Sequence, residues 1–129
     1  QTARENVRRY LAKAKPALPI RCREIDVHCT SATTFSYPDS DLLVYMYRPF
    51  TGEVFIEALN NLEDFRRATG RRVTIILCCP FEEALLEQHR AFRKSGTFRV
   101  LAREYSWVIY EGVASRSEAF KPEVAAITI

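Results

Sequence analysis

Glycine is scarce in this chain, and what there is lies scattered. The four glycines are far apart in the sequence, at Gly52, Gly70, Gly96 and Gly112. Loops that hold a phosphate or a dinucleotide need clustered glycines, because the backbone must approach the ligand closely. The sequence therefore lacks the glycine loop of a complete nucleotide-type cofactor site.

Long apolar runs are absent as well. The longest, Leu42 to Tyr47 and Val73 to Cys79, are far shorter than the roughly 20 residues that span a bilayer, so we expect no membrane contact. No secretory leader is recognisable, and the cysteines show neither a disulfide framework nor a metal-binding spacing; they are Cys22, Cys29, Cys78 and Cys79. We therefore expect a cytoplasmic protein without a metal site.

The size and charge of the chain indicate how many domains it has and which partners to expect. Its 129 residues, 47% hydrophobic and 27% charged, fit one soluble domain. We expect that domain over residues 1–114, with a tail over 115–129. The net charge is only +3, and no aromatic residues for stacking bases interleave with the basic residues of the first helix. These features argue against a nucleic-acid partner.

The first half of the chain predicts a helix, a short strand, a central strand and a second helix. Helical spacing covers Thr2 to Lys15, and Ile20 to Val27 alternates weakly. Asp41 to Tyr47 is apolar at both alternating sets of positions, which predicts a central strand covered on both faces. Glu53 to Arg67 is an amphipathic helix, with Thr51 as its cap and Gly70 as its terminator.

The second half predicts another strand and helix, followed by a hairpin. Arg72 to Cys79 is a second doubly buried strand, and a helix from Pro80 to about Lys94 follows it. Phe98 to Arg103 and Trp107 to Glu111 are too close in sequence for anything except antiparallel pairing. The predicted fold is α/β, with a mixed, mostly parallel sheet that ends in an antiparallel hairpin.

This order of elements carries a resemblance to a known family. The central strand, the turn Arg48-Pro49-Phe50, and the final Trp107-Val108-Ile109-Tyr110-Glu111 strand resemble the second half of class I S-adenosylmethionine-dependent methyltransferases. Small bacterial members whose fourth strand ends in Tyr-Asn-Pro-Phe are the most similar. The resemblance implies a Rossmann-like sheet of seven strands with the last one antiparallel. It also implies a cofactor across the carboxyl ends of the first strands and an acceptor beside the fourth-strand loop.

The resemblance assigns a cofactor role to three residues. Asp26 matches the position that contacts the adenine, Val27 lies beside it, and Tyr47 ends the fourth strand. The family's glycine before that Asp is Ile25 here, which adds bulk beside the adenine. The first strand, its glycine loop and the ribose-binding carboxylate have no counterpart in this chain. It thus carries about half of a cofactor site, and we expect it to bind S-adenosylmethionine weakly or not at all.

The catalytic positions implied by the resemblance are Arg48, Pro49 and Phe50, in the loop beside the transferred methyl group. The family's Asn is replaced by Arg48, a fixed cation. Arg48 either orients an anionic acceptor or is a surface charge, and Asp26 is either a ligand carboxylate or a loop-capping residue. Pro49 and Phe50 also suit a purely structural role in the turn.

Two functions follow from this. The first is the carboxyl-terminal part of a methyltransferase with an unknown acceptor, and the alternative is a non-catalytic, truncated α/β module that acts through dimer or partner contacts. In the family the first strand lies beside the fourth, and its absence leaves the edge of Leu42 to Tyr47 without that neighbour. We therefore expect a homodimer or a rearranged sheet, in which Ile20 to Val27, the tail Val124 to Ile129 or a partner chain covers this edge. We also expect Tyr45 and Tyr47 in the core. Cys78 and Cys79, as neighbours in a strand, should point to opposite faces.

Overall fold

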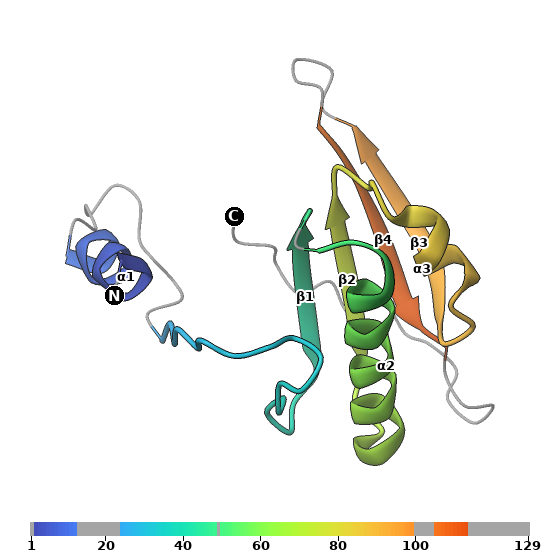
Figure 1. The fold of residues 1–129 in the computed structure, drawn as a ribbon, viewed down its shortest axis with the longest axis horizontal. Helices are drawn as coiled ribbons and strands as arrows, with labels where there is room; N and C mark the ends of the chain where they lie inside the picture. Colours follow the sequence, from blue (N-terminus) through green and yellow to red (C-terminus); the bar gives the residue numbers. More distant parts are fainter. Residues whose placement is uncertain (1, 13–23, 49, 100–104, 114–129) are drawn as a thin grey trace. The chain divides into compact units, whose positions relative to one another are not determined.

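The computed structural model describes residues 2–12, 24–48, 50–99 and 105–113 of the chain. These fall into two compact units, divided after Thr30, and each is described by itself. The elements in chain order are α1 Thr2–Ala12, β1 Leu42–Tyr47, α2 Gly52–Thr69, β2 Val73–Cys78, α3 Glu83–Gln88, β3 Phe92–Arg99 and β4 Ser106–Gly112 (Figure 1).

The N-terminal unit contains α1 and an extended segment. Within α1, Glu5 accepts hydrogen bonds from Arg8 and Arg9 at 2.6 and 3.1 Å, and none of its described side chains is buried. Arg4 donates to the Val27 carbonyl at 3.2 Å. Residues 24–30 form no strand, so the strand expected over Ile20 to Val27 is wrong for its described end; residues 20–23 lie outside the described part. The alternation there was weak, and most of these side chains are exposed.

The second unit is built on a mixed four-stranded sheet in the order β1-β2-β4-β3. β1 and β2 are parallel, from Leu42 opposite Val73 to Tyr47 opposite Cys78, whereas β4 is antiparallel to both β2 and β3. The α/β class and the parallel pair are confirmed, and so is the antiparallel hairpin where Phe98 and Arg99 pair with β4. Residues 100–103 of the predicted hairpin strand and the tail expected over 115–129 lie outside the described residues. The expectation of a mostly parallel sheet is wrong, because β4 inserts between β2 and β3 and makes two of the pairings antiparallel.

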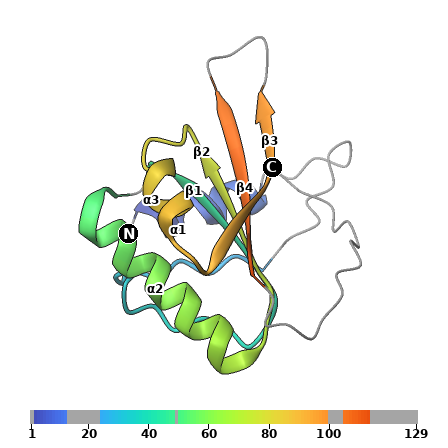
Figure 2. The ribbon, with the colours of Figure 1, turned by 90° about the vertical axis from the view of Figure 1, so that its right-hand side faces the viewer.

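Helix α2 covers one face of this sheet (Figures 1 and 2). Its buried Phe55, Leu59 and Leu62 share one hydrophobic core with inward-facing residues of all four strands; these include Met46, Val73, Ile75, Leu77, Phe92, Val108 and Tyr110. Full burial of each large side chain contributes about 1.5–3 kcal/mol to stability. The helix and the strands next to it are therefore held together mainly by this face.

Both ends of α2 are placed by specific backbone and side-chain contacts. At its carboxyl end, Gly70 adopts a left-handed conformation with φ 70° and donates its N–H to the Arg66 carbonyl at 2.9 Å. The Arg66 side chain then crosses β4, and its Nη1 donates to the Val113 carbonyl at 2.7 Å. A Cβ atom on Gly112 would lie 2.5 Å from Arg66 Cδ, so a larger residue at this position would displace the Arg66 side chain.

The helix expected from Pro80 to Lys94 is wrong over most of its length. Helix α3 has 6 residues and stops before His89, and Phe92 to Arg99 is a strand. Charges at the end of a helical pattern suggested a longer helix, but Lys94 instead reaches from β3 to Glu83 at 2.5 Å. Pairing of β3 with β4 over nearly its full length satisfies backbone groups that a continued helix would satisfy locally.

The loop before β1 packs against α2. Asn61 donates two hydrogen bonds, to the carbonyls of Ala32 and Phe35, each at 3.0 Å. Next along the chain, the Tyr37 ring lies 5.5 Å from that of Phe65. Asp41 then accepts from the Arg72 backbone N–H and from its guanidinium, at 3.0 and 2.8 Å. These contacts fix the start of β1 beside the start of β2.

The sheet face away from α2 carries exposed apolar side chains. On β1, Leu43, Tyr45 and Tyr47 are 59%, 58% and 53% exposed. The expectations that this strand is central, covered on both faces, and that its tyrosines are core residues are therefore wrong. Within the part of the chain that the structure describes, β1 is an edge strand, because β2 is its one neighbour in the sheet. The apolar pattern of β1 identifies side chains that can be buried, but it does not show which element covers them.

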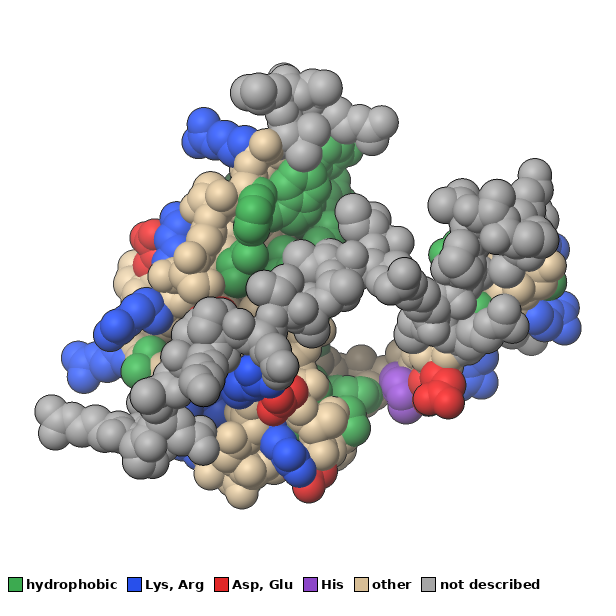
Figure 3. All heavy atoms as spheres, turned by 180° about the vertical axis from the view of Figure 1, so that it is seen from behind, with side chains coloured by type: hydrophobic (Ala, Val, Ile, Leu, Met, Phe, Trp, Pro, Cys, Tyr) green, Lys and Arg blue, Asp and Glu red, His purple; other side chains and the backbone are tan. Residues whose placement is uncertain are grey.

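Aromatic residues from the hairpin extend this surface. The Tyr105 ring lies 6.4 Å from Tyr47 and 6.3 Å from Trp107, and Phe98 pairs across the ladder with Trp107. Figure 3, seen from behind relative to Figure 1, shows hydrophobic side chains gathered over the sheet. We call this surface the open face; it comprises Leu43, Tyr45, Tyr47, Phe98, Tyr105 and Trp107.

Candidate functional site

The carboxyl ends of β1 and β2 lie side by side, since Tyr47 is opposite Cys78 in a parallel pair. The residue after each strand is in the left-handed region: Arg48 has φ 41° and Cys79 has φ 50°. This conformation costs a residue with a side chain roughly 1–2 kcal/mol. Such strain persists only where surrounding contacts impose it, and it concentrates at functional sites. The Cys79 N–H donates to the Ser106 carbonyl at 2.8 Å, which is one such contact.

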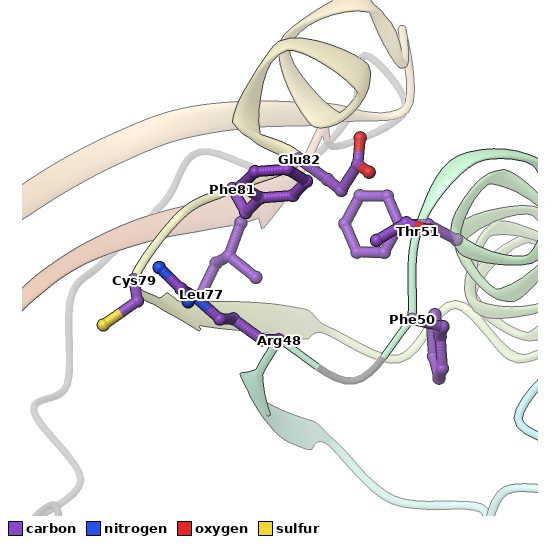
Figure 4. Close-up of a pocket in the computed structure, with 8 residues that line it drawn as sticks. Arg48, Phe50, Thr51, Leu77, Cys79, Phe81 and Glu82 are labelled. Carbon is purple, nitrogen blue, oxygen red and sulfur yellow. The ribbon is translucent and has the colours of Figure 1, made fainter.

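A cavity of about 240 Å³ opens at these strand ends (Figure 4). Its lining includes two apolar core side chains, Phe55 and Leu77, which are 0% and 2% exposed. The segments that follow β1 and β2 supply its walls. We call it the strand-end pocket; it is lined by Arg48, Phe50, Thr51, Phe55, Leu77, Cys79, Phe81 and Glu82.

Glu82 occupies the N-terminus of α2. Its Oε1 accepts a hydrogen bond from the Gly52 N–H at 3.3 Å, at the positive end of the helix dipole. Thr51 stands at the expected cap position, but its side chain makes no capping hydrogen bond. The carboxylate from the β2 loop thus replaces the predicted cap, and the first turn of α2 stabilises its charge.

Arg48 is the other charged residue of the pocket. Its side chain extends from the end of β1 toward the end of β2, with the guanidinium near Cys79 (Figure 4). Within the described part of the chain, this guanidinium makes no hydrogen bond or ion pair. Desolvation and the Cys78 thiol raise the pKa of the Cys79 thiol, while Arg48 acts in the opposite direction. Arg48 is therefore a cation available to an anionic ligand.

The two adjacent cysteines do not point to opposite faces as expected. Their sulfur atoms lie 3.9 Å apart, and both are free thiols. The left-handed backbone at Cys79 turns this residue out of the strand, so the alternation of side chains ends at Cys78. The expectation failed because the strand ends one residue earlier than its apolar pattern.

The structure brings only part of the predicted site together. Arg48 and Phe50 both line the strand-end pocket, and the Phe50 ring lies 6.2 Å from that of Phe55. Tyr47 is beside them in sequence but faces the open face, where Tyr105 and Cys79 raise the pKa of its phenol. Pro49 lies outside the described residues.

Asp26 and Val27, the expected adenine-side residues, belong to the N-terminal unit and are described there alone. Asp26 is exposed, and Val27 is half-buried. The contact of the Val27 carbonyl with Arg4 ties this segment to α1.

Sequence reasoning missed the β2 half of the pocket. Cys79 was placed at the end of a strand, and Phe81 and Glu82 at the start of a helix, although the loops after neighbouring parallel strands meet at one edge of the sheet. The parallel pairing of the two strands, which was predicted, was the signal that could have identified them.

Among the described residues, no three or more His, Cys, Asp and Glu side chains form a group that could hold a metal ion. No helix among them is long and apolar enough to cross a membrane. Comparisons with protein families, curated proteins and solved structures found no match.

Proposed function

We propose that this chain is the carboxyl-terminal part of an S-adenosylmethionine-dependent methyltransferase with a Rossmann-like sheet, and that its strand-end pocket receives the methyl acceptor. The observation that carries the proposal is the apolar edge of β1, which has no second strand beside it among the described residues, together with the open face. In the resembled family, the first strand lies beside the strand that corresponds to β1. An edge free of charge, proline or bulge fits a strand that normally has a second neighbour.

The topology is consistent with this proposal. The resemblance calls for a parallel pair followed by an antiparallel last strand, and β1, β2 and β4 have these relations. It also calls for an acceptor beside the loop after the fourth strand. In this chain the corresponding loop, with Arg48 and Phe50, forms one wall of the strand-end pocket.

The residues present do not complete a site for the cofactor. The scattered glycines offer no loop for close backbone approach, and Tyr47, Asp26 and Val27 are the only counterparts that the resemblance assigns. We therefore assign no chemical step to this chain alone. Its own contribution is to bind and orient the acceptor. The free thiols of Cys29, Cys78 and Cys79 suit the reducing cytoplasm, which we propose as the location.

The test is methyl transfer by the protein made from the native reading frame. It should transfer radiolabelled methyl groups from S-adenosylmethionine to acceptors in a small-molecule extract, and a variant of an upstream glycine loop should not. A native reading frame that encodes no glycine loop after an apolar strand, or a protein without transfer to any extract, would contradict the proposal.

The open face favours one alternative. A contiguous set of exposed aromatic side chains commonly marks a protein interface. A non-catalytic module that acts through a homodimer or another partner would use this surface and would need no cofactor. It predicts stable self-association or partner binding together with no methyl transfer by the native protein.

A further inference from the structure

The strand-end pocket has the size and lining to hold one aromatic ring. Its volume is about 240 Å³, whereas an apolar cavity of about 150 Å³ holds benzene. Four of its lining residues are apolar and large: the buried Phe55 and Leu77, and Phe50 and Phe81. Phe81 is 71% exposed, so a ring bound beside it would remove apolar surface from water.

The positions of the two charged side chains determine which way round a charged ligand would lie in the pocket. Glu82 is held by the Gly52 N–H, while Arg48 has no hydrogen-bonding or charged partner among the described residues. In Figure 4 the Glu82 carboxylate and the Arg48 guanidinium lie on different sides of the pocket. A carboxylate on the ligand would thus meet Arg48 and lie away from Glu82. A planar guanidinium binds such a group through paired, charge-assisted hydrogen bonds.

We propose that the strand-end pocket binds a small aromatic carboxylic acid, with its ring on the apolar lining beside Phe81 and its carboxylate on Arg48. This inference rests on the proposed function, because it names the chemical class of the acceptor. The described residues that line the pocket all belong to the second unit, so we expect binding without the cofactor.

Benzoate and benzyl alcohol are the probes that separate ring recognition from charge recognition. Each is titrated into the whole chain while amide chemical shifts are followed by NMR. We expect benzoate to bind about tenfold more tightly than benzyl alcohol, as one charge-assisted contact allows. Shifts should be largest for residues 48–55 and 77–82.

Two variants and a control identify the residues responsible. Arg48→Gln should remove the preference for benzoate and leave benzyl alcohol unchanged. Phe81→Ala should weaken both probes several-fold. Arg90→Gln removes another exposed arginine of the second unit, outside the pocket, and should change neither. Both pocket side chains are exposed, so the variants should keep the amide spectrum of the folded chain, which the same experiment checks.

Equal binding of the two probes, a preference for benzoate that survives in Arg48→Gln, or no binding of either probe would overturn the inference. These outcomes differ from failure of the proposed function. If the native protein transfers methyl groups to another compound but benzoate does not bind, only the proposed acceptor class is wrong. If benzoate binds but the native protein transfers no methyl groups, the ligand site is supported and the proposed enzyme activity is wrong.

Discussion

The open face predicts that the isolated chain associates through β1. Five of its side chains are between 40% and 59% exposed: Leu43, Tyr45, Tyr47, Phe98 and Tyr105. A large aromatic side chain can bury about 150–250 Å², so these five leave roughly 500 Å² uncovered per chain. A standard interface buries about 800 Å² on each partner. Pairing of two β1 edges would supply much of the remainder, and we expect a dimer of micromolar affinity.

The perturbation is the double variant Leu43→Lys/Tyr45→Lys. It removes roughly 200 Å² of apolar surface per chain, which corresponds to about 5 kcal/mol at 25 cal/mol per Å² as an upper bound. It also places two charges on an edge strand, where lysine disfavours pairing. We expect the dimer dissociation constant to rise at least a hundredfold, which is about 2.7 kcal/mol. The monomer should remain folded, because both side chains are already more than half exposed.

Sedimentation velocity across a range of concentrations measures this effect. The matched control is Val54→Lys/Ala68→Lys, which adds the same charges at exposed positions of α2. The control should associate like the original chain. A chain that stays monomeric up to millimolar concentration, or a β1 variant that associates as strongly as the control, would refute this reasoning.

Three further predictions follow from individual residues. Gly70→Ala should lower the free energy of unfolding by about 1 kcal/mol in urea titrations, because Gly70 has φ 70°, whereas Gly70→Asn should cost less; equal stability of all three proteins would contradict this. The Arg72 backbone N–H and guanidinium hold the pKa of Asp41 below its usual value, so this stabilisation is present above about pH 4 and is lost as pH falls through the folded pKa. Asp41→Asn should therefore lower the melting temperature slightly at pH 7 and not at pH 2, and a deficit that persists at pH 2 would contradict the assignment. In the native methyltransferase that we propose, Arg48→Ala should reduce turnover or acceptor affinity with little change in melting temperature; unaltered kinetics would make Arg48 a surface charge.

Local patterns predicted the elements whose stability comes from buried apolar faces. β1, β2 and α2 were found from their apolar spacing, and the left-handed glycine at the end of α2 was found from its position. The first part of the strand β3, from Phe92, was missed because its stability comes from pairing with β4. The sequence around Lys94 has the spacing and charges of a helix end, and its pairing partner lies beyond the turn.

The candidate site, too, could be predicted only where local sequence is sufficient. The β1 half of the pocket, with Arg48 and Phe50, was predicted from its place after a parallel strand. The β2 half depends on Glu82 reaching Gly52, a contact between residues 30 positions apart. No local pattern reports such a contact. The exposure of Tyr45 was missed for a related reason, since apolar alternation does not identify the element that covers a strand.

The central claim is that this chain carries part of a methyltransferase and about half of its cofactor site. Isothermal titration of S-adenosylmethionine into the isolated chain and into the protein made from the native reading frame tests it most directly. We expect micromolar binding by the native protein and at least about a hundredfold weaker binding by the chain, because two or more charge-assisted hydrogen bonds are missing. Micromolar binding by the isolated chain would contradict the claim that it carries only half of the cofactor site. Absence of binding by the native protein would contradict the claim that it is a methyltransferase.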